Sequence, residues 1–209
     1  MRDSADPPLP DERRTALLQA AVAVFARYGY RKASMDEVAR AAGLSRQGLY
    51  LYFSSKEILF REGLAFLLAS SLRAGLAALS DPGRSAEDIL VTAFDAMHGQ
   101  YVDSLGTTPH LAELMETSTR LVGPLIQEQE RTFLTAVTEA LERTGIARAW
   151  KPAGLSAREL AEMLEAVAYG LKHRVTARAD YLLHIRRAAR VVCYPAATPT
   201  SRTRSRKGS

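Results

Sequence analysis

Residues 46–56 carry side chains that could recognise and hold a nucleic acid. Arg46 and Gln47 are neighbours, and their side chains have the donors and acceptors that recognise guanine and adenine edges in the major groove. Gly48 follows directly, and because it lacks a side chain it permits a close approach to a base or to the sugar backbone. This order of residue types indicates a short helix that presents its first turn to DNA.

Hydroxyl and ammonium groups around this segment suit the phosphate backbone. Tyr50 and Tyr52 offer phenolic hydroxyls, although Tyr52 could instead pack against a preceding helix. Lys56 lies at an expected helix N-terminus, where the dipole also favours an anion. Ser34 caps another helix and could donate its hydroxyl or backbone N–H to a phosphate. The predicted DNA contacts are Ser34, Ser45, Arg46, Gln47, Gly48, Tyr50, Tyr52 and Lys56.

Three short elements must position these groups, and the sequence predicts helices at about 11–28, 35–42 and 46–52. Gly43 lets the chain reverse between the second and third helices, and Ser45 caps the third. Leu49 and Phe53 lie on one side of that third helix and can anchor it to the body. Together these features predict a helix-turn-helix between Ser34 and Tyr52. The alternative is a plain three-helix bundle with Tyr50 and Phe53 in its core.

The rest of the chain also predicts helices, because Ala, Leu, Glu and Arg dominate and no segment keeps a period of two. Ser34 with Glu37, Ser54 with Glu57 and Ser156 with Glu159 have capping-box spacing. Further helices are expected at about 55–79, 86–104, 109–118, 124–144, 157–176 and 179–194. The predicted fold is all-α with about nine helices. Residues 1–10 are expected to be flexible and 195–209 to form a disordered basic tail.

The motifs of residues 14–60 resemble those of the TetR/AcrR family of bacterial transcriptional regulators. The resemblance rests on AAVAVFARYGY at 20–30, SMDEVARAAGLS at 34–45 and GLYLYFSSKE at 48–57. It implies a DNA-binding domain over 1–54 and a helical effector-binding and dimerisation domain over 55–194. It also implies an effector between the helices of 55–176 and a homodimer through the last two helices. Arg186, Arg187 and Arg190 are expected on a solvated face or opposite acidic residues of a second subunit.

Aromatic and polar side chains inside the second domain are the candidates for an effector site, since an apolar cavity with a few polar groups suits a small molecule. The alternative is that they are ordinary core residues. The candidates are Phe94, Met97, His98, Tyr101, Met115, Glu116 and Phe133.

Several classes of function find little support in the sequence. Cys193 is the single cysteine, which leaves no internal disulfide and too little sulfur for a structural zinc site. His110 and Glu113 share a helix face, but no third metal ligand is identifiable, so no metal or cofactor is expected. No uninterrupted apolar run or signal peptide is apparent, which favours a cytoplasmic protein without a membrane segment. No catalytic constellation is found, so an enzyme is not expected.

The pattern favours a regulator that binds double-stranded DNA. One short helix reads few base pairs, so a two-fold dimer on a palindromic operator is expected. The favoured hypothesis is a repressor that a small-molecule effector releases from this operator. The alternative is a non-sensing architectural or protein-interaction factor of the same fold.

Overall fold

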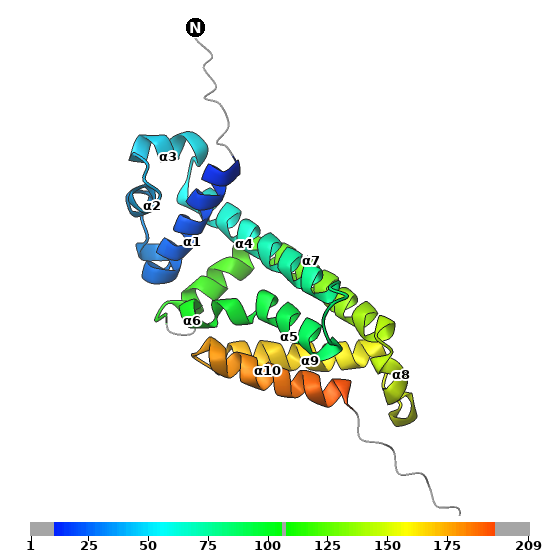
Figure 1. Cartoon of the computed structure of the whole chain (residues 1–209). Coiled ribbons are helices and arrows are strands. Elements are labelled where there is room, and N and C mark those ends of the chain that lie inside the picture. The colour runs from blue at the N-terminus through cyan, green and yellow to red at the C-terminus, as the bar shows by residue number, and fades with distance from the viewer. Residues whose placement is uncertain (1–10, 106–107, 195–209) are drawn as a thin grey trace, which may run out of the picture.

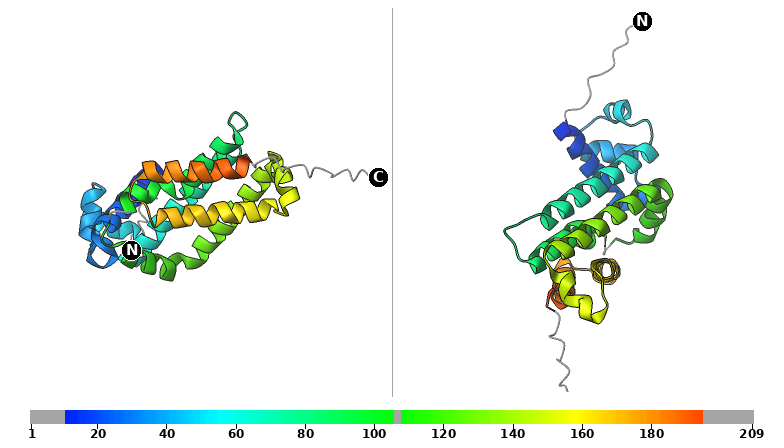
Figure 2. Two further views of the ribbon diagram at one scale, coloured as in Figure 1. Left: turned by 90° about the horizontal axis from the view of Figure 1, so that it is seen from below. Right: turned by 90° about the vertical axis from the view of Figure 1, so that its right-hand side faces the viewer.

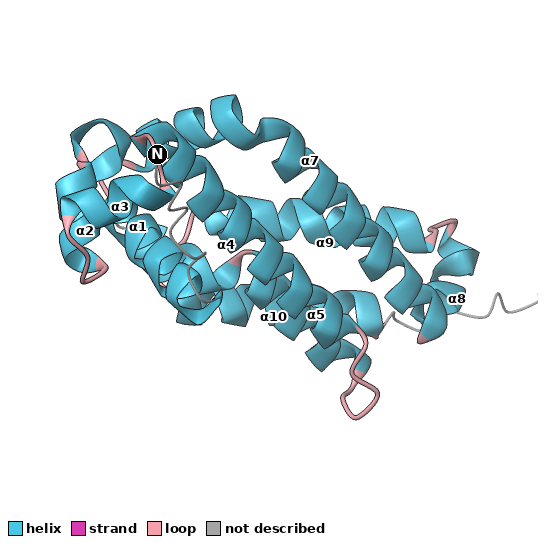
Figure 3. Ribbon diagram, turned by 90° about the horizontal axis from the view of Figure 1, so that it is seen from above, coloured by secondary structure: helices cyan, strands magenta, loops and turns pink. Residues whose placement is uncertain are grey.

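The computed structural model describes residues 11–105 and 108–194, and in this part of the chain all regular structure is helical (Figures 1 and 3). The predicted all-α fold is therefore confirmed. The predicted flexible start and basic tail lie outside the described residues. The α-helices are α1 (Asp11–Lys32), α2 (Met35–Ala41), α3 (Arg46–Tyr52), α4 (Lys56–Leu79), α5 (Ala86–Met97), α6 (Val102–Leu105), α7 (Leu111–Arg143), α8 (Ile146–Trp150), α9 (Ala157–Lys172) and α10 (Arg178–Cys193). Two 3₁₀ turns are η1 (Gly99–Tyr101) and η2 (Lys151–Ala153).

Side-chain caps start many of these helices where the sequence predicted them. Ser34 and Ser156 each complete a capping box with the glutamate three residues later. Before α4, however, the cap is Ser55 rather than Ser54, and its hydroxyl accepts from the Ile58 N–H. The local caps thus set the starts of helices independently of tertiary packing.

Two buried clusters divide the apolar residues. The N-terminal cluster joins α1, α2, α3 and the start of α4, and it includes Leu114 from α7. The C-terminal cluster fills the space between α5, α7, α9 and α10, around Phe94, Phe133 and Tyr181. Helix α4 contributes Leu59 and Phe60 to the first cluster and Leu79 to the second. One continuous helix therefore connects both cores, as Figure 1 shows.

The helices of the C-terminal body differ from the prediction in three places. The two helices expected at 109–118 and 124–144 form one long α7, which passes Gly123 and Pro124 with a kink at Val122 (φ −135°, ψ 17°). Proline removes an internal hydrogen bond, and here the helix bends instead of ending. The helix expected at 86–104 is broken by the non-helical backbone of His98 into α5, η1 and α6. The short α8 was not expected.

Helix α1 also departs from its expected end. Gly29 adopts φ 77° and ψ 163°, a conformation that only glycine takes readily, yet a further turn reaches Lys32. The Ala33 N–H donates to the Gly29 carbonyl and closes this turn. The kink turns the residues after Gly29 away from the axis of α1.

Helix α4 is long and apolar enough in length and composition to cross a membrane, with a mean hydropathy of 1.3 over its most apolar window. The sequence analysis expected no uninterrupted apolar run long enough to span a membrane, and this expectation holds for α4. Arg61 and Arg73 interrupt its apolar run. The same composition serves a helix that packs on other helices, and α4 packs against α1, α5 and α7.

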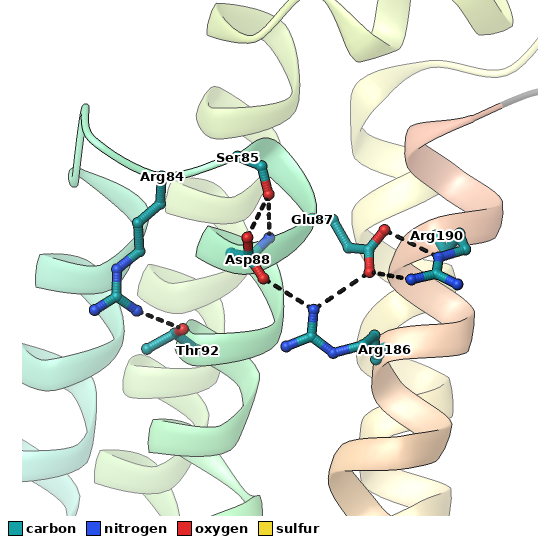
Figure 4. Close-up of polar contacts among 7 residues, drawn as sticks. All are labelled: Arg84, Ser85, Glu87, Asp88, Thr92, Arg186 and Arg190. Carbon is teal, nitrogen blue, oxygen red and sulfur yellow. Dashed lines mark hydrogen bonds and ion pairs between the residues drawn. The ribbon is translucent and has the colours of Figure 1, made fainter.

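A buried glutamate ties α5 to α10 (Figure 4). Glu87 is 7% exposed, and its carboxylate accepts hydrogen bonds from the guanidinium groups of Arg190 and Arg186 at 3.0 to 3.3 Å. Arg186 also bonds to Asp88 at 2.9 Å. Arg186, Arg187 and Arg190 are all exposed, in agreement with the expected solvated face. The acidic partners of Arg186 and Arg190 lie on α5 of the same chain rather than on a second subunit.

Candidate nucleic-acid interface

A tight turn connects α2 to α3 and fixes the helix-turn-helix. Gly43 has φ 67°, and the Leu44 N–H donates to the Ala39 carbonyl at 2.8 Å, which closes the C-terminal end of α2. The Ser45 hydroxyl then accepts from the Gly48 N–H at 3.0 Å and caps α3. Leu49 and Phe53 are buried and hold α3 against the N-terminal core. The predicted helix-turn-helix is thus confirmed as a structure.

The outer face of α3 carries Arg46, Gln47 and Tyr50, all of them exposed. The Arg46 guanidinium lies 3.2 Å from Asp36 and 5.7 Å from the centre of the Tyr50 ring. Both partners are at the surface, so the ion pair is weak and leaves the guanidinium able to reorient. Three of the predicted contact residues therefore lie side by side on one exposed turn and a half of helix.

Leu51 was missed by the sequence reasoning, although it is 62% exposed on α3. Its position four residues after Gln47 places both side chains on the same face of the helix. An exposed leucine suits apolar contact with a thymine methyl group or with the sugar backbone. The helical period alone could have identified it.

Ser34 and Lys56 lie at the helix starts where the sequence predicted them, but their donors have partners within the chain. The backbone N–H and the hydroxyl of Ser34 both donate to Glu37 Oε2 at 2.8 Å, so the capping box occupies the donors that were expected to meet a phosphate. The Lys56 ammonium donates to the carbonyls of Arg31 and Ala33 at 3.1 and 3.0 Å. It also lies 4.9 Å from the centre of the Tyr30 ring. In this structure both side chains support the helix-turn-helix from within.

Two other predicted residues also have structural roles. Tyr52 is half-buried and packs against the N-terminal core, which is the alternative considered for it. A Cβ added to Gly48 would lie 3.1 Å from the Ser45 hydroxyl oxygen, so a side chain here would crowd the cap of α3. Close packing at the cap is therefore a second reason for glycine at this position.

The helix-turn-helix is fastened to the body where α1 ends and α7 begins. Glu113 Oε1 accepts from the backbone N–H of Arg31 at 2.6 Å, and the Thr108 hydroxyl donates to the Ala26 carbonyl at 2.8 Å. His110 packs against Gly29 beside Glu113. His110 and Glu113, considered above as metal ligands, therefore make the contact between the two parts of the chain. Within the described ranges, no group of three or more potential metal ligands is found.

A cavity of about 260 Å³ lies between the N-terminal core and the body. Its walls come from α1, α4, α5, η1, α7 and α9. Four predicted effector residues line it, namely Met97, His98, Tyr101 and Met115.

The other three predicted effector residues are placed elsewhere. Phe94 and Phe133 are completely buried in the C-terminal core, where their rings meet edge to face at 5.2 Å. Glu116 is exposed on α7 and does not line the cavity. None of these three side chains lines the cavity, because Phe94 and Phe133 pack in the C-terminal core and Glu116 faces solvent.

The sequence reasoning missed several polar residues that line the cavity. Gln129 is only 7% exposed, and Lys172 reaches the cavity from the last turn of α9. Ser71 of α4 lines it as well and is hydrogen-bonded to Tyr101. In the sequence, each of them is a polar residue on the otherwise apolar face of a helix. A search for aromatic side chains does not detect this pattern.

Comparison with known proteins agrees with this geometry. Residues 17–62 match the family model described as "Bacterial regulatory proteins, tetR family". The chain is 43% identical over 63 residues to the HTH-type transcriptional regulator YfiR of Bacillus subtilis (strain 168), a match covering 30% of this chain and 31% of YfiR. It is 28% identical over 131 residues to YhgD of the same organism, covering 63% of this chain and 68% of YhgD. It is 56% identical over 46 residues to the HTH-type transcriptional activator FasR of Mycolicibacterium smegmatis (strain ATCC 700084 / mc(2)155), covering 22% of this chain and 21% of FasR.

Solved structures extend the likeness of the fold to most of the chain. The fatty acid degradation regulator FadR from Bacillus halodurans superposes with a TM-score of 0.63 at 18% identity, over 90% of this chain and 98% of FadR. A TetR-like transcriptional regulator from Rhodococcus sp. RHA1 superposes with a TM-score of 0.57 at 24% identity, over 88% and 97%. The sequence motifs, the helix-turn-helix and these matches together identify residues 17–62 as a DNA-binding domain similar to that of the tetR family of bacterial regulatory proteins.

Proposed function

We propose that the protein is a dimeric transcriptional repressor that binds a palindromic DNA operator and is released by a small-molecule effector. The observation that carries the proposal is the exposed face of α3, where Arg46, Gln47 and Tyr50 project from a helix fixed by buried Leu49 and Phe53. These side chains match the donors and acceptors of base edges and phosphates. Such a complex would form in the cytoplasm, where the bacterial chromosome lies.

Within this proposal, the eight predicted DNA residues divide into two groups. Arg46 and Gln47 read bases, Gly48 permits the close approach, and Tyr50 meets a phosphate. Ser45, Ser34, Tyr52 and Lys56 hold α2 and α3 at the angle that the major groove requires. Lys56 reaches a phosphate only with the one N–H that remains after its two internal hydrogen bonds, whereas both donors of Ser34 are occupied.

The dimer is supported by apolar side chains that stay exposed on the last two long helices. Figure 2 shows α9 and α10 side by side along one edge of the body. Met163 and Val167 on α9 and Leu183 and Val191 on α10 are 41% to 65% exposed. A second copy would bury these residues in a four-helix contact related by a two-fold axis. The two α3 helices would then face successive major grooves.

The sensing part of the proposal is supported by the cavity at the junction. It is lined by α1, which belongs to the helix-turn-helix domain, and by α4, which connects that domain to the body. An occupant can change operator affinity only if it binds one arrangement of these helices better than another. A solidly packed body would have favoured the non-sensing alternative. The activator name of FasR belongs to a relative whose match covers only 46 residues, 22% of this chain.

Operator binding tests this proposal directly. Genome-wide mapping of bound DNA identifies the operator, and fluorescence anisotropy then measures the affinity of purified variants for it. Gln47→Ala should weaken specific binding by about 1–3 kcal/mol and relax the base preference at one position of each half-site. Gln127→Ala, an exposed change on α7, is the control and should bind like the parent. Equal binding by both variants would show that α3 is not the recognition helix.

A further inference from the structure

The cavity has an apolar end and a polar end. Toward the helix-turn-helix its walls are Val22, Phe25, Phe60, Leu64 and Leu114. The polar lining residues lie further along the same helices, with Ser71 on α4 and Gln129 on α7, and with Lys172 on α9. The apolar and polar lining residues of α4 and α7 lie on different turns of these helices, so the cavity has two chemically distinct ends. An occupant that satisfies both ends must itself be amphipathic.

Two polar side chains at the far end are buried without a complete set of partners. Gln129 Oε1 has no hydrogen-bond partner among the described residues, and the residue is 7% exposed. His98 is 4% exposed, and its Nε2 lies 3.0 Å from Glu165 Oε1, whereas its Nδ1 has no partner in that part of the chain. Buried polar groups without a partner are costly and are usually satisfied by water or a ligand. Their position on the cavity wall points to a ligand.

Lys172 decides the charge of that ligand. No described acidic group lies within ion-pair distance of its ammonium. Burial lowers the pKa of Lys172, and the nearby Glu130 and Glu165 only partly oppose this effect. Glu165 is bonded to His98. Glu130 also lines the cavity, but it is exposed, where water screens its charge, and it makes no ion pair with Lys172. A partly buried ammonium has three donors and no acceptor, so it favours an anionic oxygen as its partner.

We infer that the cavity binds a small amphipathic monocarboxylate. Its carboxylate accepts hydrogen bonds from the Lys172 ammonium and from Nε2 of Gln129, once the amide group turns over and exchanges Nε2 with the unpartnered Oε1. Its hydrocarbon chain extends toward Val22 and Phe25. The inference rests on the proposed function, because it names the class of effector for that cavity. A volume of about 260 Å³ lies just below the usual range for drug-sized ligands, which suits a short or medium-length chain.

The orientation has a consequence for signalling. Val22, Phe25 and Ala26 are residues of α1, and Phe25 also belongs to the N-terminal core that holds α3. The end of the hydrocarbon chain therefore touches the domain that carries the recognition helix. The length of the ligand's hydrocarbon chain should control the change in operator affinity, since only a hydrocarbon chain long enough to reach α1 can displace that helix.

The test is direct binding of three probes of equal chain length to the full protein. Decanoate, decanol and decylamine are titrated by calorimetry into the parent and into Lys172→Met, which keeps the length of the side chain. Decanoate should bind the parent tightest, and Lys172→Met should weaken it about ten- to a hundredfold with little change for decanol. Lys151→Met is the matched control on the exposed η2 turn and should bind decanoate like the parent.

A second variant, Leu68→Phe, narrows the cavity without changing its charge, so its effect on binding is distinct from that of Lys172→Met. It should weaken decanoate and decanol alike, and thermal unfolding shows whether each variant is folded. Preference for decylamine, unchanged decanoate binding by folded Lys172→Met, or no binding of any probe would overturn the inference. Operator affinity of the same preparation without probe is measured separately. Its loss would contradict the proposed function, whereas intact operator binding without decanoate binding would contradict only the ligand class.

Discussion

Glu113 accepts a hydrogen bond from the backbone N–H of Arg31 at 2.6 Å, and this contact links the end of α1 to the start of α7. The N–H is available because the backbone kinks at Gly29. A charged acceptor makes the bond stronger than a neutral pair. One carboxylate and one glycine are therefore among the groups that position the helix-turn-helix on the body.

Gly29→Ala should destabilise the protein by about 2 kcal/mol or more, because two separate costs add. The backbone at φ 77° and ψ 163° is unfavourable for alanine, and the new Cβ would lie 2.8 Å from Glu113 Oε2. Gly145→Ala is the control, since it shares φ 77° but has no atom within 4 Å of the added Cβ. It should cost about 1–2 kcal/mol. Urea unfolding measures the free energy of unfolding of both variants. If Gly29→Ala loses no more stability than Gly145→Ala, the Glu113 side chain moves aside freely.

Lys56→Met should destabilise the DNA-free protein by about 1 kcal/mol, because the carbonyls of Arg31 and Ala33 lose their donor. Lys32→Met, an exposed lysine of the same α1 end, should have little effect. Denaturant unfolding gives this comparison. The salt dependence of operator binding reports separately on a phosphate contact, whose loss lowers the slope by about one. A Lys56→Met variant as stable as the parent would contradict the supporting role.

Glu87 should make stability depend on acid pH. The hydrogen bond from Arg190, helped by Arg186, holds the pKa of Glu87 below its ordinary value of 4.5 against the opposing effect of burial. A depressed folded-state pKa stabilises the protein above the unfolded pKa, and this contribution disappears as pH falls through the folded value. Glu87→Gln should therefore lower stability at neutral pH, and this variant should lose less stability than the parent as the pH falls below about 4.5.

Urea unfolding from neutral pH to about pH 3 measures this dependence. Glu139→Gln on the exposed face of α7 is the matched control and should keep the acid slope of the parent. An unchanged slope in Glu87→Gln would show that other carboxylates dominate acid unfolding.

Val167→Glu should convert the proposed dimer to a monomer, because it places a charge in the middle of the apolar face of α9. Sedimentation measures the mass, and operator affinity should fall with the loss of the second recognition helix. Thr135→Glu, an exposed change on α7, serves as the control. If the parent itself sediments as a monomer, or Val167→Glu remains dimeric, this face is not the dimer contact.

Local sequence determined the parts of the protein that depend on neighbouring residues. Ser34 with Glu37 set the start of α2, and Gly43 with Ser45 set the turn and the start of α3. These are interactions within a few residues, so residue type and spacing are sufficient to predict them. The recognition helix and its exposed Arg46 and Gln47 follow from the same rules.

Tertiary structure decided what the long side chains and the long helices do. Lys56 turns to the carbonyls after α1 because the kink at Gly29 brings them within reach. Phe94 and Met97 lie on one helix, yet packing against Phe133 buries the first and leaves the second on the cavity wall. The passage of α7 through Pro124 likewise depends on neighbouring helices. The sequence determined where the recognition helix lies, whereas packing between distant segments decided the cavity and its connection to that helix.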